Sequence, residues 1–330
     1  MSTKIQKTYN DIQKAVADSK SVLIFSHSAP DGDSIGSQLA FRNYILNQGK
    51  SVEIINDGPV PNMYKKLPDT EAVMDLVKTS ALNRFDLLVV LDCSNLERIG
   101  KVKELIKYSI PIINIDHHPD NNGFGTINLV SATSSSTAEI LTEYFVGINH
   151  IIDKKTATQL YAAIITDTGR FRYESTSRRT MELVGILIES GAKPRDICDN
   201  IYYSLSPSKL RITGKMLETA MFFEDGKICM MEVSQDNIKK YNATLNDFNG
   251  LAEFTLHAEG TVVGALLEEH ENNNVKVSLR SKSDINVSEV AHAFGGGGHF
   301  NASGCIIKSS LKTSRDRLLD NLKGLVNASV

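Results

Sequence analysis

Carboxylate and imidazole side chains recur in this sequence, in most cases directly after a short apolar stretch. They are His27, Asp31, Asp33, Asp92, Asp116, His117, His118 and Asp167. Taken singly, an Asp after a strand is commonly a helix N-cap, and a lone His at a strand end is usually a hydrogen-bonded side chain. Capping does not explain why nearly every strand end carries such a residue. Together these residues therefore predict a shared metal site.

The charge of this set indicates which ions it would bind. Four carboxylates, those of Asp31, Asp33, Asp92 and Asp167, bring four negative charges that two divalent cations would neutralise. Without cations, the carboxylates would repel each other and raise one another's pKa values. With two cations roughly 3.5 to 4 Å apart and Asp92 between them, a shared water would become a hydroxide near neutral pH. Such a site hydrolyses phosphate esters or anhydrides.

The ligand types narrow the choice of metal. Mixed carboxylate and imidazole ligands favour manganese over calcium or magnesium, and iron or cobalt would also fit. The four cysteines are scattered without C-x-x-C spacing, which excludes a thiolate-rich zinc site and a disulfide framework. Cys93, although it follows Asp92, is expected to be a small buried filler rather than a nucleophile.

The elements that position these residues alternate between strands and helices. Apolar runs predict strands at 21–26, 51–56, 86–91, 110–115 and 125–130, and helical periodicity predicts helices at 4–18, 38–47, 138–145 and 151–165. This alternation is typical of an α/β fold with a parallel sheet. In such sheets ligands bind at the carboxyl ends of the strands. Most of the Asp and His residues named above follow the predicted strands and therefore lie at that edge.

The pattern changes near residue 193 and becomes rich in strands. A connecting helix is predicted at 206–223, with Ser206 as N-cap and Pro207 at its first position. Strands follow at 227–233, 261–268, 275–281 and 303–309, and a helix at 284–293 precedes the glycine run 295–298. We expect a catalytic domain at 1–190, a linker region at 191–223 and a smaller domain at 224–330.

Composition sets limits on partners and location. The length of 330 residues suits two domains, and 41% hydrophobic with 23% charged residues is ordinary for a globular protein. The net charge of −3 argues against a duplex DNA-binding surface. The absence of a long apolar run or a signal-peptide pattern predicts no membrane partner and a cytoplasmic location.

Five motifs in this order resemble a known family. His27-Ser-Ala-Pro-Asp31-Gly-Asp33, Asp92, Asp116-His117-His118 and Asp167 resemble the four motifs of the DHH phosphoesterases. The stretch Gly295-Gly-Gly-Gly-His299-Phe-Asn-Ala-Ser-Gly304 resembles the glycine-rich signature of their DHHA1 domain. The resemblance spans about residues 20–310. It implies a parallel-sheet DHH domain and a smaller α/β DHHA1 domain with a mixed sheet, joined by a linker helix.

The resemblance also implies roles for the residues. His27, Asp31 and Asp92 would hold one Mn²⁺, with Mg²⁺ or Co²⁺ as substitutes. The second ion would be held by Asp33, Asp92, His117 and Asp167. Asp116 would not bind an ion but would orient a ligand histidine or the neighbouring backbone. His118 would face the scissile phosphate. In the second domain, the expected contacts to substrate are Arg280, His299, Gly296, Gly297 and Gly298.

Within the family, the short two-domain form is similar to enzymes with two activities. We therefore expect hydrolysis of single-stranded RNA of a few nucleotides, including dinucleotides, and conversion of adenosine 3′,5′-bisphosphate (pAp) to AMP. One alternative is a phosphodiesterase for linear or cyclic dinucleotides such as cyclic di-AMP. Another is a nucleotide-binding regulator without catalysis, although no metal ligand is missing. The direction of RNA digestion and the oligomeric state, including a homodimer, stay open.

Overall fold

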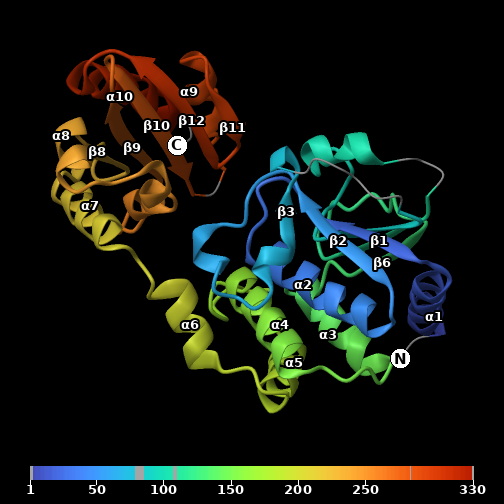
Figure 1. Cartoon of the computed structure of the whole chain (residues 1–330). Coiled ribbons are helices and arrows are strands. Elements are labelled where there is room, and N and C mark those ends of the chain that lie inside the picture. The colour runs from blue at the N-terminus through green and yellow to red at the C-terminus, as the bar shows by residue number, and fades with distance from the viewer. Residues whose placement is uncertain (1–2, 79–84, 107–109, 283, 329–330) are drawn as a thin grey trace. The chain divides into compact units, whose positions relative to one another are not determined.

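The computed structural model describes residues 3–78, 85–106, 110–282 and 284–328. The chain forms two compact units, Met1–Ser204 and Leu205–Val330 (Figure 1). Each unit contains its own six-stranded sheet and is described separately. The finer division at 190 and 223 stays a prediction.

The first unit is built on a parallel sheet. Its strands are β1 (Ser21–Phe25), β2 (Ser51–Asn56), β3 (Val73–Asp75), β4 (Leu87–Leu91), β5 (Ile112–Asp116) and β6 (Ile127–Val130). The order is β3-β2-β1-β4-β5-β6, and every neighbouring pair is parallel. The predicted α/β fold with a parallel sheet is thus confirmed, and β3 is a strand that the sequence analysis did not predict.

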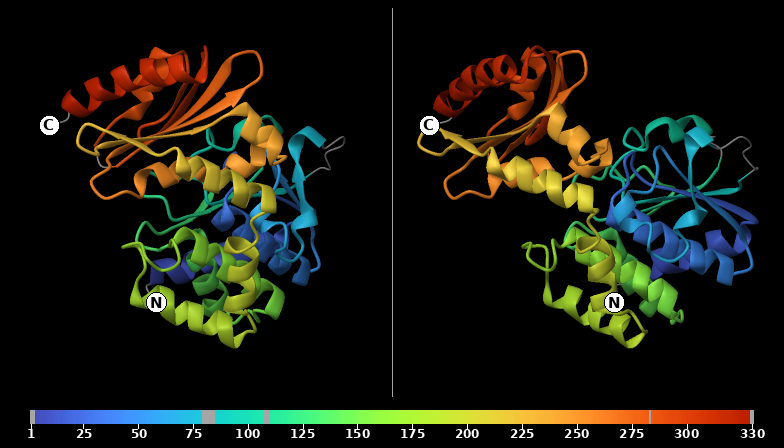
Figure 2. Two further views of the ribbon diagram at one scale, coloured as in Figure 1. Left: turned by 90° about the vertical axis from the view of Figure 1, so that its left-hand side faces the viewer. Right: turned by 60° about the vertical axis from the view of Figure 1, so that its left-hand side comes forward.

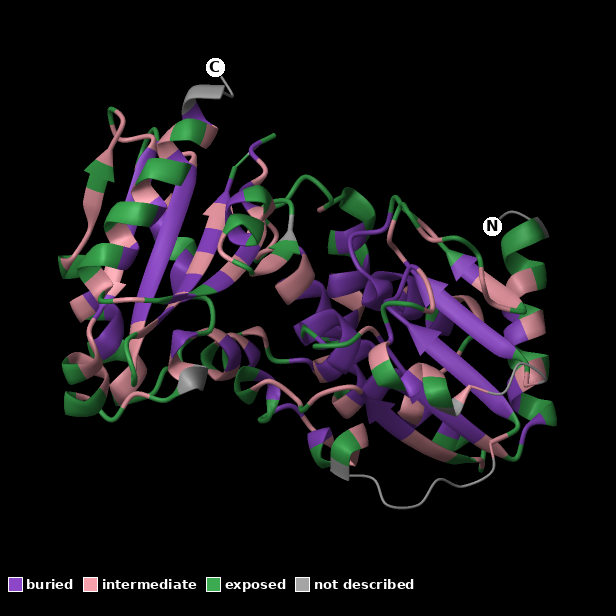
Figure 3. Cartoon of the chain, turned by 90° about the horizontal axis from the view of Figure 1, so that it is seen from above, coloured by how far each residue is buried: buried purple, intermediate pink, exposed green. Residues whose placement is uncertain are grey.

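Successive residues of these strands enter two separate hydrophobic clusters. Val22 and Ile24 of β1 pack on the face covered by helices, whereas Leu23 and Phe25 pack on the opposite face. Burial on both faces explains why the strands are almost continuously apolar, and Figure 3 shows them largely buried.

Helices surround or extend this sheet, and α2, α3 and α4 lie side by side (Figure 1). The helices are α1 (Thr3–Asp18), α2 (Gly32–Asn47), α3 (Thr137–Gly147), α4 (Lys154–Asp167), α5 (Arg178–Glu189) and α6 (Pro194–Tyr202). Short 3-10 helices are η1 (Asn62–Tyr64), η2 (Thr70–Ala72), η3 (Leu76–Lys78) and η4 (Gly100–Leu105).

The start of α2 differs from the prediction. The helix begins at Gly32 rather than at Gln38, and the Asp31 side chain caps it by accepting a hydrogen bond from Ser34 N at 3.0 Å. Its first two turns are buried. A helix buried on most sides has no polar stripe, so periodicity did not reveal where it begins.

The second unit has a mixed sheet. Its strands are β7 (Met221–Phe223), β8 (Ile228–Val233), β9 (Val263–His270), β10 (Asn274–Ser281), β11 (Gly297–His299) and β12 (Ala302–Lys308). Their order is β11-β12-β10-β9-β8-β7, with β8 and β9 parallel and the other pairs antiparallel. The predicted mixed sheet is confirmed.

Helices cover both faces of this second sheet. The face with Val275, Val277 and Leu279 packs against α9 (Val287–Ala293) and α10 (Leu311–Ala328), and α10 is the red helix along the sheet in Figure 2. The other face packs in part against α7 (Pro207–Glu218) and η6 (Leu251–Leu256). The remaining elements are α8 (Gln235–Lys240) and η5 (Leu245–Phe248).

One prediction for the second unit was wrong in detail. The helix predicted at 206–223 ends at Glu218, and the last residues of that range form β7. The last two glycines of the run 295–298 lie in strand β11, which pairs with β12. Across the described ranges, no helix is long and apolar enough to cross a membrane.

Candidate active site

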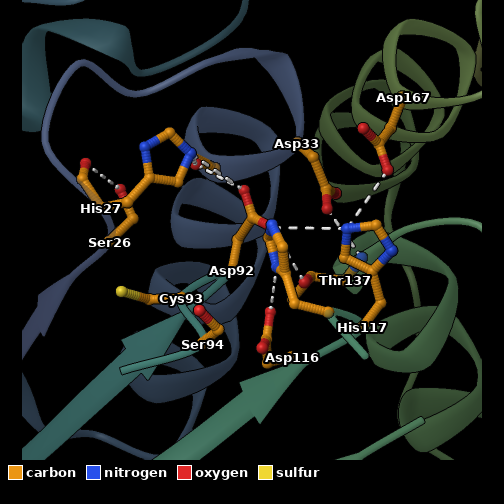
Figure 4. A network of polar contacts seen from close by, with 12 residues as sticks. Ser26, His27, Asp33, Asp92, Cys93, Ser94, Asp116, His117, Thr137 and Asp167 are labelled. Carbon is orange, nitrogen blue, oxygen red and sulfur yellow. Dashed lines mark hydrogen bonds and ion pairs between the residues drawn. The ribbon is translucent and has the colours of Figure 1, made fainter. Parts of the chain in front are cut away.

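The carboxyl edge of the parallel sheet gathers the predicted residues. His27 follows β1, Asp92 follows β4, and Asp116 is the last residue of β5. The start of α2 supplies Asp33, and α4 ends at Asp167. Figure 4 shows these side chains pointing toward one another from different elements.

Asp92 is the centre of the group. Its Oδ2 atom lies 3.5 Å from His27 Nε2, and its Oδ1 atom lies 3.6 Å from His117 Nε2. Its side chain is buried, with 2% exposed, and Figure 4 shows it between the two histidines. Asp92 has a backbone φ of 56°, a left-handed conformation that is uncommon for Asp and recurs at functional sites.

Two sets of possible metal ligands lie on the two sides of Asp92. One set is His27, Asp31 and Asp92, and the other is Asp33, His117 and Asp167. Within each set, the candidate ligand atoms lie within 4.8 Å of one another. Oxygen and imidazole donors in this arrangement suit divalent transition metals. A third set combines Asp92 with His117 and His118.

Asp33 is held by the first turn of α3. Its Oδ2 accepts a hydrogen bond from Thr137 N at 2.7 Å, and its Oδ1 accepts one from Ala138 N at 3.0 Å. Ser37 Oγ also donates to Oδ1 at 3.2 Å. A carboxylate at a helix N-terminus is stabilised by the helix dipole and the free N–H groups, so α3 fixes this side chain.

Asp116 and His118 form a hydrogen-bonded pair, and Asp116 belongs to none of the three sets. His118 Nδ1 donates to Asp116 Oδ1 at 2.7 Å, and Asn121 Nδ2 donates to Asp116 Oδ2 at 2.7 Å. Asp116 is fully buried. Because the Nδ1–H group donates its hydrogen bond to Asp116, the ring orientation is fixed and the Nε2 atom is available for another contact.

The carboxylates influence one another's pKa values strongly. Burial and the neighbouring charge of Asp92 raise the pKa of Asp31 and of Asp33, and they raise the pKa of Asp167 to about 7. The expected upward shift is therefore confirmed for these three. It was wrong for Asp92. Burial opposes ionisation there too, but hydrogen bonding and charge from His27 lower its pKa to about 2.

The same contact changes His27. Burial by itself disfavours the imidazolium, but the hydrogen bond and charge of Asp92 outweigh burial and raise the pKa of His27 to about 9. In the absence of cations, protons on the crowded carboxylates and on His27 balance the negative charge of the group. This behaviour is expected of a site that binds cations.

Two further residues, Ser34 and Thr137, touch this group. Ser34 Oγ donates to Asp92 Oδ2 at 2.6 Å and lies 2.9 Å from His27 Nε2. Thr137 Oγ1 donates to Asp92 Oδ1 at 3.4 Å, in addition to its backbone contact with Asp33. The sequence analysis missed Ser34, although it follows the Asp31-Gly-Asp33 motif directly.

The residues predicted to contact substrate lie in the second unit. Arg280 on β10 pairs with Ala302 on β12, which pairs with His299 on β11. Arg280 and His299 thus lie in one row across the sheet. The side chain of His299 is outside the part of the chain that the structure describes.

Close packing against β12 explains why glycine occurs before and within β11. A Cβ on Gly296 would lie 2.1 Å from Gly304 O, and a Cβ on Gly298 would lie 2.6 Å from Ser303 Cα. Gly298 also has φ 142°, a conformation that other residues rarely adopt. Gly297 is less crowded. The close strand pairing requires glycine at 296 and 298, and a role in binding stays a prediction for all three.

Known proteins similar to this chain cover nearly all of it. The bifunctional oligoribonuclease and PAP phosphatase NrnA of Thermus thermophilus is 29% identical over 307 residues, or 92% of this chain and 89% of that protein. The protein of that name from Mycoplasma genitalium is 29% identical over 92% of this chain and 94% of its own length. The crystal structure of an exopolyphosphatase-related protein from Bacteroides fragilis is 26% identical and covers 98% of both chains, with a TM-score of 0.85.

A parallel sheet with this donor set at its carboxyl edge defines a class of metal-dependent hydrolase. Residues 21–164 match the DHH family, N-terminal domain, and residues 225–328 match the DHHA1 domain. The chain therefore belongs to the DHH family of phosphoesterases and is a hydrolase that acts on phosphoester bonds.

Proposed function

We propose that this chain hydrolyses RNA of a few nucleotides to mononucleotides and removes the 3′-phosphate from pAp, using two divalent cations. The observation that carries the proposal is the position of Asp92. Its Oδ2 atom faces His27 of the first set, and its Oδ1 atom faces His117 of the second set. The names of the NrnA relatives support the pair of substrates. Manganese is the proposed ion because carboxylate and imidazole ligands are mixed.

Each cation would have its own ligands in addition to Asp92. His27 and Asp31 would complete the first set, and Asp33, His117 and Asp167 the second. When bound, two divalent cations would neutralise phosphate charge and lower the pKa of a nearby water toward neutrality. Ser34 and the first turn of α3 hold the ligand carboxylates in place, so their orientation is set before substrate arrives.

His118 is the proposed contact to the substrate phosphate. Its Nδ1 proton is committed to Asp116, which leaves Nε2 to donate to a phosphate oxygen or to the leaving group when the ring is protonated. The hydrogen bond from Asp116 raises the pKa of His118, which favours the protonated ring. A donor aimed at charge that develops during the reaction is an effective form of transition-state stabilisation.

The second unit is proposed to bind the rest of the substrate. Arg280 is half-buried on β10 and would pair with a phosphate, as would His299 in the same row of the sheet. The backbone near Gly296, Gly297 and Gly298 would approach the nucleotide closely.

A substrate panel tests the proposal. The protein with Mn²⁺ is incubated with dinucleotides to pentanucleotides, pAp, cyclic di-AMP and pyrophosphate, and the products are separated by chromatography. We expect mononucleotides from the oligonucleotides and AMP from pAp. Preference for cyclic di-AMP would replace the proposal with a dinucleotide phosphodiesterase, and the absence of any turnover would refute it.

A further inference from the structure

Arg98 lies in the segment between β4 and η4, close behind Asp92. Its carbonyl oxygen accepts a hydrogen bond from Ser28 N at 2.7 Å, which ties this segment to the loop that carries His27. Neither the sequence motifs nor the proposed function gives this residue a role.

The same segment is also tied to the loop that carries His118. Asn121 Nδ2 donates to Cys93 O at 3.2 Å, and Asn122 N donates to Ser94 O at 3.1 Å. Ser94 is fully buried, and its Oγ donates to Asp120 Oδ2 at 3.3 Å. The segment with Arg98 therefore has a fixed position beside the loop from Asp116 to Asn122.

The guanidinium of Arg98 is anchored but not neutralised. Its Nη1 donates to Ser94 Oγ at 3.4 Å, and the residue is exposed. Among the residues that the structure describes, no carboxylate lies at ion-pair distance from it, whereas the neighbouring Lys103 pairs with Glu97. Most of its donors are thus available for a ligand.

The guanidinium of Arg98 lies beside the two loops that form the active site. It contacts Ser94, which is two residues from Asp92, and the same Ser94 side chain reaches Asp120, which is two residues from His118. The proposed metal ligands include four carboxylates, and a substrate phosphate needs positive partners beyond the two proposed cations. A guanidinium stays charged and presents several donors in one plane, which suits phosphate oxygens.

We propose that Arg98 binds the nonbridging oxygens of the substrate phosphate that lies beside His118. This inference rests on the proposed function, and it adds a binding residue from the catalytic unit itself. The competing explanation is a purely structural one, in which Arg98 only stabilises the loop near Asp120 through Ser94. The two explanations differ in what the removal of the charge should change.

Three variants separate these explanations. Arg98→Gln removes the charge, Arg98→Lys keeps it, and Lys101→Gln removes an exposed charge from the adjoining η4 as a matched control. Lys101 uses its backbone N–H, not its side chain, in a bond to Asp57 Oδ2 at 2.9 Å. Turnover of pAp and a dinucleotide is measured with Mn²⁺, and calorimetry measures Mn²⁺ affinity and the binding of inorganic phosphate to the Mn²⁺-loaded protein.

We expect Arg98→Gln to lower kcat/KM by roughly 10- to 100-fold, as the loss of a charge-assisted hydrogen bond does, and to weaken phosphate binding. Mn²⁺ affinity should be unchanged, Arg98→Lys should recover part of the loss, and Lys101→Gln should resemble the wild type. Unchanged phosphate binding in Arg98→Gln, an equal loss in Lys101→Gln, or a loss of Mn²⁺ affinity would overturn the inference. A wild-type protein without turnover refutes the proposed function instead, while phosphate binding still decides the role of Arg98.

Discussion

At the scale of single residues, identical side chains have different properties because their neighbours differ. His117 Nε2 lies 3.4 Å from Asp167, whereas the adjacent His118 directs Nδ1 to Asp116. Asp92 has a lowered pKa and Asp167 a raised one, because His27 lies against Asp92 and burial dominates at Asp167. The proposed division of roles follows these contacts.

Asp116→Asn tests the proposed support of His118. The uncharged Asn side chain would no longer offer His118 a negatively charged hydrogen-bond acceptor. We therefore expect kcat to fall by about 10- to 100-fold, the usual effect of removing the residue that orients an active-site histidine. Mn²⁺ affinity should stay unchanged, because Asp116 belongs to none of the metal-ligand sets. Steady-state kinetics and Mn²⁺ titration check both statements. An unchanged kcat, or a loss of Mn²⁺ binding, would assign Asp116 another role.

The pKa values of the metal-free protein predict that Mn²⁺ binding releases protons. His27, with its pKa raised to about 9, carries a proton at pH 7.5, and Asp167, with a pKa of about 7, carries one in part of the molecules. Both must lose these protons to bind a cation. Mn²⁺ affinity should therefore rise from pH 6 to about pH 9 and level off above it. Calorimetry in buffers of different ionisation enthalpy counts the protons, and an affinity independent of pH would contradict the prediction.

At the scale of elements, the site depends on where helices begin and end. Gly32 and Thr137 begin α2 and α3, and Asp167 ends α4. The Asp33 side chain accepts hydrogen bonds from two backbone N–H groups at the N-terminus of α3. Helix α3 therefore positions Asp33 through its backbone, although it carries none of the motif residues.

Thr137→Pro tests the backbone contact. Proline is favoured at the first position of a helix, and the extended conformation of Ser136 is compatible with it, so the helix should form. The variant loses the N–H that binds Asp33, and Mn²⁺ affinity should fall by roughly 10-fold, the value of one hydrogen bond to a charged group. Thr137→Ala keeps the N–H and is the control for the lost hydroxyl. Equal affinities in the two variants would show that the N–H is unimportant.

The packing of α2 on α4 is equally specific. A Cβ on Gly36 would lie 2.5 Å from Gln159 O and 2.8 Å from Ala163 Cβ, so Gly36→Ala should destabilise the first unit by about 1–3 kcal/mol. Gly185 on α5 has open space around it, and Gly185→Ala should stabilise by about 0.5–1 kcal/mol. Urea denaturation compares the two. A neutral Gly36→Ala would mean that α2 and α4 are not in close contact.

The sequence predicted the strands well where both faces of the strand are buried. Strands β1, β4 and β5 are covered on both faces and are therefore continuous apolar runs. Periodicity should also have revealed α10, whose Leu318, Leu322 and Val326 are four residues apart and buried, but this helix was not predicted. The partner of Ser34 could not be predicted, because Ser34 and Asp92 are 58 residues apart in the chain.

At the scale of the whole molecule, each unit has its own cores. The first unit buries the two faces of its parallel sheet separately, and the second unit does the same with its mixed sheet. All proposed metal ligands lie in the first unit and the predicted contacts Arg280 and Gly296 in the second. The order of motifs along the chain corresponds to the proposed division between metal binding in the first unit and substrate binding in the second.

The most direct test of the proposed two-cation phosphoesterase is the number of Mn²⁺ ions bound per chain, measured with turnover of pAp, in the wild type and in Asp92→Ala. Because Asp92 shares one set with His27 and Asp31 and lies 3.6 Å from His117, a ligand of the second proposed ion, its removal should affect both ions. We predict two ions and AMP production for the wild type, and severely weakened binding with no detectable turnover for Asp92→Ala. Two ions and substantial activity in Asp92→Ala would contradict the proposal.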